Sequence, residues 1–187
     1  MPERPFRKLA SKIVFENPWI TLEEHKLEVT QSGHAFTYTY IAIPPSVMVI
    51  AVTPDRKIVL VEQYRYPSDR VSFELPGGGS RGLTIAEAAK KELEEETGYR
   101  AGLVEKIGEF VTYCGLSDEI CHVFLATELV AGEQNLEKTE AISVHHVSFD
   151  ELQEMIRSGR FNDGMGLAAL NLGDENLRKA LGRSASL

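Results

Sequence analysis

The feature that most constrains the fold is a glycine-rich run followed directly by a capped helix whose packing face ends in glutamates. The stretch covers residues 77–99 and is GGGSRGLTIAEAAKKELEEETGY. Thr84 and Glu87 have the spacing of a capping box, and Gly98 is a typical C-terminal stop, so a helix is expected from Thr84 to Thr97. At 100° per residue, one helix face carries Ile85, Ala88, Ala89, Glu92, Glu95 and Glu96.

Three carboxylates on a packing face need an explanation, and two interpretations are open. Carboxylates at this spacing repel one another and lose hydration when they are buried, unless a cation offsets their charge. Oxygen ligands at positions i, i+3 and i+4 can converge on a hard divalent ion such as Mg²⁺. The alternative is a solvated acidic helix face, the usual role of a charge run. Because the glutamates continue the apolar face, the cation site is favoured, and Glu94 on the other side is expected to be a surface charge.

The remaining elements predict an α/β (α+β) fold with a mixed sheet. Apolar runs at 47–52 and 57–65, joined by TPDR, predict a hairpin, and SFELP predicts a short strand before a glycine-rich loop. The segments AGLVEKIGEFVT, CHVFLATEL and AISVHHVSF predict further strands. Helices are expected from Ser148 to about Ile156 and over about 164–181, with a break near Gly173. Strands and helices that do not strictly alternate favour a mixed sheet with helices on its faces.

Residues 1–44 are expected to form an N-terminal β appendage, and residues 45–187 the main domain. The segments WITLEEHKLEV and AFTYTYIAI have strand-like patterns, and Pro44 with Pro45 breaks the chain after them. Such a small sheet is not stable alone. We therefore expect a homodimer that exchanges or shares the appendage.

Composition excludes several classes of function. The formal net charge is −8 over 187 residues, with no basic patch, so a nucleic-acid partner is not expected. An apolar run long enough to cross a membrane and a signal peptide are both missing from the sequence, so no membrane partner is expected. The two cysteines, Cys114 and Cys121, suggest neither a disulfide framework nor a zinc site. Reduced thiols in a cytoplasmic protein are the expectation.

Residues 77–99 resemble the Nudix box, which is G, five residues, E, seven residues and REUxEExGU, where U is bulky and apolar. Gly77 takes the first glycine, and the second half is matched by Glu92, Leu93, Glu95, Glu96, Gly98 and Tyr99. Leu83 stands where the pattern has glutamate, and Lys91 where it has arginine. Lysine lacks the planar fork of arginine, so we expect activity to survive with a lowered rate or an altered metal preference.

The resemblance implies a Nudix-type α/β/α sandwich that hydrolyses a nucleoside diphosphate linked to another group. It implies two or three Mg²⁺ or Mn²⁺ ions, with Glu92, Glu95 and Glu96 as ligands and a backbone carbonyl near Gly77 completing the shell. Glu92 thereby becomes a catalytic candidate as well as a ligand. Clustered cations suit this chemistry because they neutralise a pyrophosphate and lower the pKa of water.

Segments outside the box, VEQYRYP, ELPGG and GLSDE, resemble the ADP-ribose and nucleotide-sugar pyrophosphatase branch. This likeness implies that Arg65 contacts substrate phosphates and that a glutamate in the loop GEQNLEKTE, for which we choose Glu140, is the general base. Glu119 is a candidate for a substrate or metal contact, or a surface turn residue. Trp19 and Tyr38 are candidates for stacking on the base, and Trp19 has a core or dimer-interface role as its alternative.

Three functions remain to be compared. The first is metal-dependent hydrolysis of ADP-ribose or a related nucleoside diphosphate sugar to a nucleoside monophosphate and a sugar phosphate. The second is Nudix hydrolysis of another nucleotide, such as a dinucleoside polyphosphate or an oxidised nucleotide. The third is a Nudix fold that binds a nucleotide without cleaving it, an option that Leu83 and Lys91 keep open.

Overall fold

The structure is a computed structural model that describes residues 4–184. Residues 1–3 of the expected appendage and 185–187 of the expected main domain lie outside the described residues. The described chain divides into two compact units, one of residues 4–44 and 111–120, the other of residues 45–110 and 121–184. The grouping of segment 111–120 with the N-terminal strands was not indicated by the sequence patterns.

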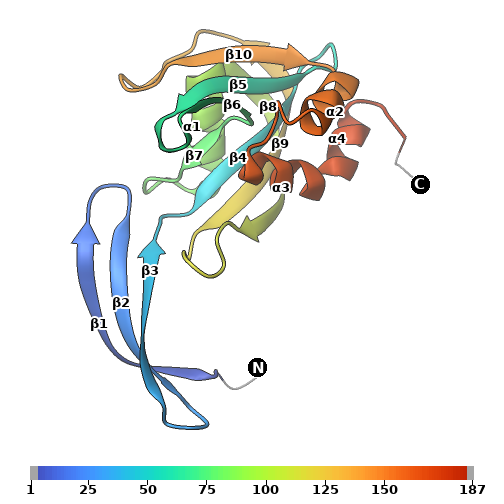
Figure 1. Ribbon diagram of the computed structural model, residues 1–187. Helices are drawn as coiled ribbons and strands as arrows, with labels where there is room; N and C mark the ends of the chain where they lie inside the picture. The colour runs from blue at the N-terminus through green and yellow to red at the C-terminus, as the bar shows by residue number, and fades with distance from the viewer. Residues whose placement is uncertain (1–3, 185–187) are drawn as a thin grey trace. The chain divides into compact units, whose positions relative to one another are not determined.

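The first unit is a three-stranded antiparallel sheet (Figure 1). Its strands are β1 (Phe6–Glu16), β2 (Thr21–Val29) and β3 (Ala35–Ala42), in the order β1-β2-β3. The quoted sequence patterns predicted β2 and β3, whereas β1 was not among the strands that they delimited. The Ile41 N–H donates to the Leu116 carbonyl over 2.8 Å, which ties segment 111–120 to β3. Within residues 4–44 and 111–120, no residue is buried.

The second unit is built around a mixed sheet, as expected, with the strand order β10-β5-β4-β9-β8. Strands β4 and β9 run parallel, while β5 is antiparallel to both β4 and β10. The bounds are Ser46–Val52 for β4, Ile58–Arg65 for β5, Tyr99–Val111 for β8, Ile120–Ala131 for β9 and Ile142–Val147 for β10.

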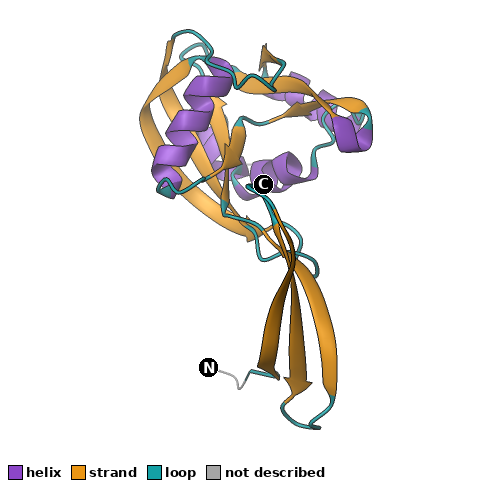
Figure 2. Cartoon of the chain, turned by 90° about the vertical axis from the view of Figure 1, so that its left-hand side faces the viewer, coloured by secondary structure: helices purple, strands orange, loops and turns teal. Residues whose placement is uncertain are grey.

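Helices cover both faces of this sheet and enclose a separate core on each (Figures 1 and 2). Val47 and Val49 of β4 pack with α1 (Ile85–Thr97), while Met48 and Ile50 point to the opposite face. That face is covered by α2 (Phe149–Arg157), α3 (Gly164–Leu172) and α4 (Asp174–Ala180). The alternation of side chains along a strand fills both cores, and the α/β/α arrangement is confirmed. Within the described chain, no helix has the length and apolar character needed to cross a membrane.

The sheet forks between β4 and β5, and this fork positions the site. The two strands pair only at Ala51–Val52 with Val59–Ile58. Beyond this point, β5 pairs with β6 (Arg70–Glu74), which follows a short 3₁₀ helix at Tyr66–Ser68, and β4 pairs with β7 (Gly77–Gly79). The expectation that the first glycines form a loop was wrong, because they form β7 against Ser46–Met48. A Cβ at Gly77 would collide with the Val47 carbonyl, so glycine permits this close pairing.

Candidate active site

Helix α1 begins and ends where the sequence predicted. The Thr84 hydroxyl accepts a hydrogen bond from the Glu87 N–H at 3.3 Å, and the Glu87 carboxylate accepts from the Thr84 N–H at 3.0 Å. Gly98 ends the helix with φ +75°, and its N–H donates to the Glu94 carbonyl over 2.8 Å. These reciprocal bonds satisfy backbone groups that a helix end leaves without partners. The helix buries Ala88, Ala89, Leu93, Glu96 and Thr97.

Glu96 is a buried carboxylate, only 5% exposed. Its Oε2 accepts a hydrogen bond from the Gly77 N–H at 2.9 Å, which links α1 to the start of β7. Burial raises the pKa of the Glu96 carboxyl to about 8, although the Gly77 hydrogen bond acts in the opposite direction. A buried anion of this kind is unfavourable without a compensating cation.

Glu92 lies one turn earlier, against the glycine backbone. Burial raises the pKa of its carboxyl, and the negative charge of Glu95 raises it further. A Cβ built on Gly78 would lie 2.7 Å from a Glu92 carboxylate oxygen. The lack of a side chain at Gly78 therefore leaves the space that the Glu92 carboxylate occupies.

Glu95, the third expected ligand, has a different environment. It is half-buried and forms an ion pair with Lys91, one turn earlier on α1. The hydrogen bond to Glu95 raises the pKa of Lys91. The lysine at the position of the family's arginine thus holds one of the three carboxylates that the sequence assigned to a metal.

The donors suit a hard divalent cation, but they are not gathered around one point. Residues 4–184 contain no group of three or more His, Cys, Asp or Glu arranged to hold a metal ion. The chemical fit is nevertheless good, since Mg²⁺ and Mn²⁺ prefer carboxylate oxygens. A cation would also relieve the burial cost that raises the pKa of Glu92 and Glu96. Glu95 would need to leave Lys91 to take part.

Arg65 is positioned at the end of β5 by a buried partner that the sequence analysis missed. Its Nε donates to Glu74 Oε1 over 2.8 Å, and its Nη2 pairs with the other Glu74 oxygen. The Gln63 amide also donates to Glu74, at 3.2 Å. The hydrogen bonds to Glu74 raise the pKa of Arg65, and the charges of Glu96 and Asp163 act in the same direction. The guanidinium therefore lies within the electrostatic field of the glutamate helix.

The loop 132–141 is anchored to the end of α1. The Gln134 side-chain amide donates to the Glu96 carbonyl over 2.6 Å, and the Asn135 N–H donates to the Glu95 carbonyl over 3.0 Å. These bonds hold the first part of the loop against the last turn of the helix, where helical carbonyls lack internal partners.

Glu140, the candidate general base, lies farther along this loop. Its Oε2 accepts a hydrogen bond from the Glu137 N–H at 2.8 Å, and the Glu137 carboxylate pairs with Arg81 in the turn after β7. The charge of Glu140 contributes to raising the pKa of both Glu92 and Glu96. The structure thus brings Glu140 near Glu92 and Glu96, and its role as a base stays a prediction.

The remaining candidates belong to the first unit. Trp19 is 63% exposed. The Tyr38 hydroxyl donates to the Gly115 carbonyl over 2.8 Å, and the Glu119 carboxylate accepts from the Thr112 hydroxyl at 2.9 Å. Both of these bonds are internal to the first unit. The substrate contacts expected of Trp19, Tyr38 and Glu119 stay predictions.

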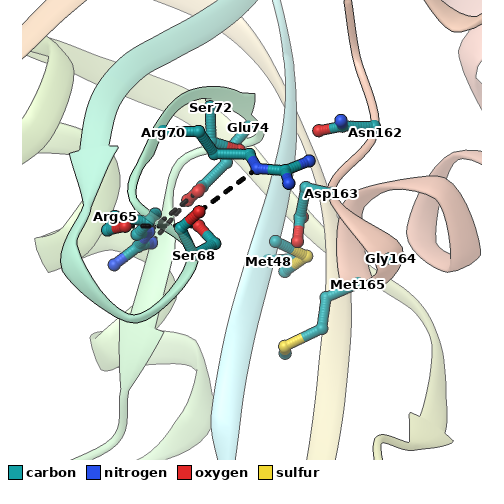
Figure 3. A pocket seen from close by; sticks show the side chains of 10 residues that line it. All are labelled: Met48, Arg65, Ser68, Arg70, Ser72, Glu74, Asn162, Asp163, Gly164 and Met165. Atoms are coloured by element: carbon teal, nitrogen blue, oxygen red, sulfur yellow. Dashed lines mark hydrogen bonds and ion pairs between the residues drawn. The ribbon is translucent and has the colours of Figure 1, made fainter. Parts of the chain in front are cut away.

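A pocket of about 410 Å³ opens in the fork between β4 and β6 (Figure 3). Its walls include Arg65 and Glu74, together with Asp163 at the N-terminus of α3. Sequence reasoning missed Glu74 and Asp163. A sequence signal existed for each of them. Glu74 is the first residue of the segment ELPGG, and Asp163 precedes a helix as a typical N-cap residue. The Asp163 carboxylate accepts a hydrogen bond from the Gly166 N–H at 2.6 Å.

Comparison with known proteins gives a consistent family assignment. The family model of the NUDIX domain matches residues 42–164. An ADP-ribose pyrophosphatase of Bacillus subtilis (strain 168) is 35% identical over 160 residues, which are 84% of this chain and 86% of that protein. A methanol dehydrogenase activator of Bacillus methanolicus is 30% identical over 167 residues, 88% of this chain and 90% of that protein.

A solved structure, the crystal structure of an ADP compounds hydrolase, superposes with a TM-score of 0.83 at 20% identity. The superposition covers 97% of this chain and 98% of the hydrolase chain, and it shows that the two proteins share a fold. The matched domain spans most of the chain, and the capped glutamate helix lies within it. The protein therefore belongs to the Nudix hydrolase family.

Proposed function

We propose that this protein hydrolyses the pyrophosphate bond of ADP-ribose or a related nucleoside diphosphate sugar in a metal-dependent reaction. The products are a nucleoside monophosphate and a sugar phosphate. The observation that carries the proposal is the buried Glu96 carboxylate, which lies within the field of Arg65. The half-buried Glu92 lies one turn earlier, against the glycine backbone. The likeness to a Bacillus subtilis ADP-ribose pyrophosphatase supports the choice of substrate.

Glu92, Glu95 and Glu96 would hold the divalent cations, Mg²⁺ or Mn²⁺ and two or three per site, with a backbone carbonyl near Gly77. When bound, such cations neutralise the pyrophosphate charge and make a water molecule more acidic. Helix α1 packs on the sheet through Ala88, Ala89 and Leu93, and this packing buries Glu96. The third carboxylate, that of Glu95, forms an ion pair with Lys91.

Arg65 is proposed to bind the substrate phosphates. A guanidinium can donate two parallel hydrogen bonds to a phosphate, and Glu74 holds this side chain at the end of β5. Since the side chain of Arg65 is 49% exposed while that of Glu74 is 7% exposed, the arginine has an accessible surface beyond its buried partner.

Glu140 is proposed to accept the proton of the attacking water. The charge of its carboxylate affects both Glu92 and Glu96. In the structure, the Glu140 carboxylate also caps the Glu137 N–H. A general base must come within hydrogen-bonding distance of the water, and such contacts commonly form only in the substrate complex.

The first unit is proposed to bind the base through Trp19 and Tyr38 and to form a homodimer. Its sheet exposes large apolar side chains and buries none within residues 4–44 and 111–120. A sheet with so little buried surface needs a partner for stability. Glu119 remains a candidate substrate or metal contact from segment 111–120. A cytoplasmic location is also proposed, because the two cysteines of the sequence suggest no disulfide framework.

A hydrolysis screen tests the proposal. ADP-ribose, several nucleotide sugars, dinucleoside polyphosphates and oxidised nucleotides are incubated with Mg²⁺ or Mn²⁺, and the products are separated by chromatography. We expect ADP-ribose or a nucleotide sugar to be cleaved fastest, giving a nucleoside monophosphate. Faster cleavage of another nucleotide class would select the second function. Tight calorimetric binding without product after long incubation would select the non-catalytic binding module.

A further inference from the structure

We infer that the pocket in the sheet fork is the subsite for the hydroxyl-rich sugar of a nucleoside diphosphate sugar, with Arg70, Ser72 and Asn162 as its polar contacts. The inference rests on the proposed function, because it assigns one part of the same substrate to a specific set of residues. All of the lining residues belong to the second unit.

The pocket adjoins the glutamate site through two structural links. Met48 lines the pocket, and it pairs in the sheet with Gly77, whose N–H donates to Glu96. Arg65 also lines the pocket, and the negative charges of Glu96 and Asp163 both raise the pKa of its guanidinium. A pyrophosphate bound near Glu96 and Arg65 would therefore have one end directed toward the pocket.

The size and lining of the pocket favour a sugar over a nucleobase. A volume of about 410 Å³ lies within the usual range for small-molecule pockets. The lining contains no aromatic ring for a base to stack on. Met48 and Met165 provide apolar contact for the carbon skeleton of a sugar, and the other side chains are polar or charged.

Arg70 is the pocket's available cation. It lies opposite Arg65 in the β5–β6 pair, yet only Arg65 has a carboxylate partner among residues 4–184. The Nε of Arg70 donates only to the Ser68 carbonyl, at 3.4 Å. Figure 3 shows the Arg70 guanidinium directed across the pocket toward Asn162 and Asp163. Its N–H groups can therefore donate to sugar hydroxyls.

The opposite wall supplies acceptors and further donors. Asp163 caps α3 with its Oδ2, and its carboxylate faces the pocket in Figure 3. Ser72 and Asn162 each carry groups that donate and accept. Hydroxyl groups also donate and accept, so this mixture suits a sugar better than it suits a phosphate or an apolar group.

The test uses the two product fragments as separate probes on the full chain. Ribose 5-phosphate and AMP are titrated by calorimetry into the wild type and into Arg70→Gln, with the exposed Arg157→Gln as a control for the loss of one positive charge. We expect Arg70→Gln to weaken ribose 5-phosphate binding roughly 10-fold, as for a lost hydrogen bond to a charged group, and to leave AMP binding unchanged. Asn162→Ala should show the same selectivity more weakly.

The alternatives give different results. If Arg70→Gln weakens AMP binding instead, the pocket holds the nucleoside, and the inference is wrong. Equal effects on both fragments, or none, also overturn it, and Asn162→Ala provides the same readout if Arg70→Gln does not fold. Turnover of ADP-ribose by the wild type tests the proposed function separately. If the wild type cleaves ADP-ribose but Arg70→Gln does not change the affinity for ribose 5-phosphate relative to that for AMP, only the pocket assignment is rejected.

Discussion

At the scale of single residues, burial separates glutamates that the sequence places side by side. Glu94 pairs with the exposed Arg100, Glu95 with Lys91, and Glu96 is buried against Gly77. The same functional group therefore has three environments within three positions of one helix. Only the burial of Glu96 creates a carboxylate with its pKa raised to about 8, which is the state that a cation would reverse.

Replacing Glu96 tests this distinction. We expect Glu96→Gln to lower kcat by at least roughly 100-fold, because the substitution removes a proposed metal ligand. Without added metal, Tm should be unchanged or higher, because the amide has no charge to bury. Glu94→Gln, on the exposed side of the same helix, is the matched control and should retain activity. Full activity of Glu96→Gln in a steady-state assay would refute the assignment.

Lys91 gives a second prediction, concerning metal affinity rather than rate. If Lys91 competes with the cation for Glu95, Lys91→Gln should tighten Mn²⁺ binding by about 2–5-fold, in line with the strength of exposed ion pairs. Lys90→Gln removes the same charge from the exposed neighbouring position. Calorimetric Mn²⁺ titration of both variants separates the specific pair from general electrostatics, since competition predicts that only Lys91→Gln shows the effect.

At the scale of elements, the site depends on how the loop 132–141 is held. Gln134 and Asn135 bind its first part to the end of α1, whereas the later part is tied to the turn after β7 by Arg81 and Glu137. Arg81 has φ +46°, an uncommon conformation for a non-glycine residue. The Arg81–Glu137 pair therefore joins the glycine turn to the loop that carries Glu140.

A double-mutant cycle tests this link. Arg81→Gln and Glu137→Gln should each lower kcat several-fold, and the double variant should be no worse than either, because both break the same contact. Tm should change little, since an exposed pair adds about 0–1 kcal/mol to stability. The exposed pair Arg157–Glu154 on α2 is the control cycle. Additive losses in kcat would show that the two side chains act independently.

At the scale of the whole molecule, the two units differ in how they are stabilised. The second unit has two hydrophobic cores, one on each face of its sheet. The first unit has three strands and exposes Phe6, Ile13 and Phe15 on β1 at about half of their surface. The family assignment rests mainly on the second unit, since the matched region begins at residue 42.

The proposed homodimer gives a prediction at this scale. Phe15→Asp places a charge on the exposed apolar surface of β1, so it should shift the protein from dimer to monomer in analytical ultracentrifugation. Val130→Asp, at an exposed position in the second unit, should leave the mass unchanged. A monomeric wild type over a wide concentration range would contradict the proposal.

Part of the fold and of the site could be predicted from sequence because it depends on local bonds. The capping box at Thr84 and Glu87, the stop at Gly98 and the break near Gly173 depend on residues a few positions apart. The hairpin of β4 and β5 and the carboxylate face of α1 follow in the same way from periodicity. The sequence likewise contained the Nudix pattern, which the family match confirms.

The other features depend on contacts between residues far apart in the chain. The glycine run becomes a strand because β4 lies beside it. The loop that carries Glu140 is held by the bonds of Gln134 and Asn135 to α1 and by the Arg81–Glu137 ion pair. No local pattern encodes such pairings, because they arise when the sheet forks and β6 and β7 take different partners.

The sequence by itself determined that a capped helix presents glutamates on its packing face, since helical geometry follows from neighbouring residues. Tertiary structure decided which of these glutamates is buried, which is paired with Lys91, and where the pocket opens beside them. The physical reason is that desolvation, which raises the pKa of Glu96, depends on what packs against a side chain and not on its sequence neighbours.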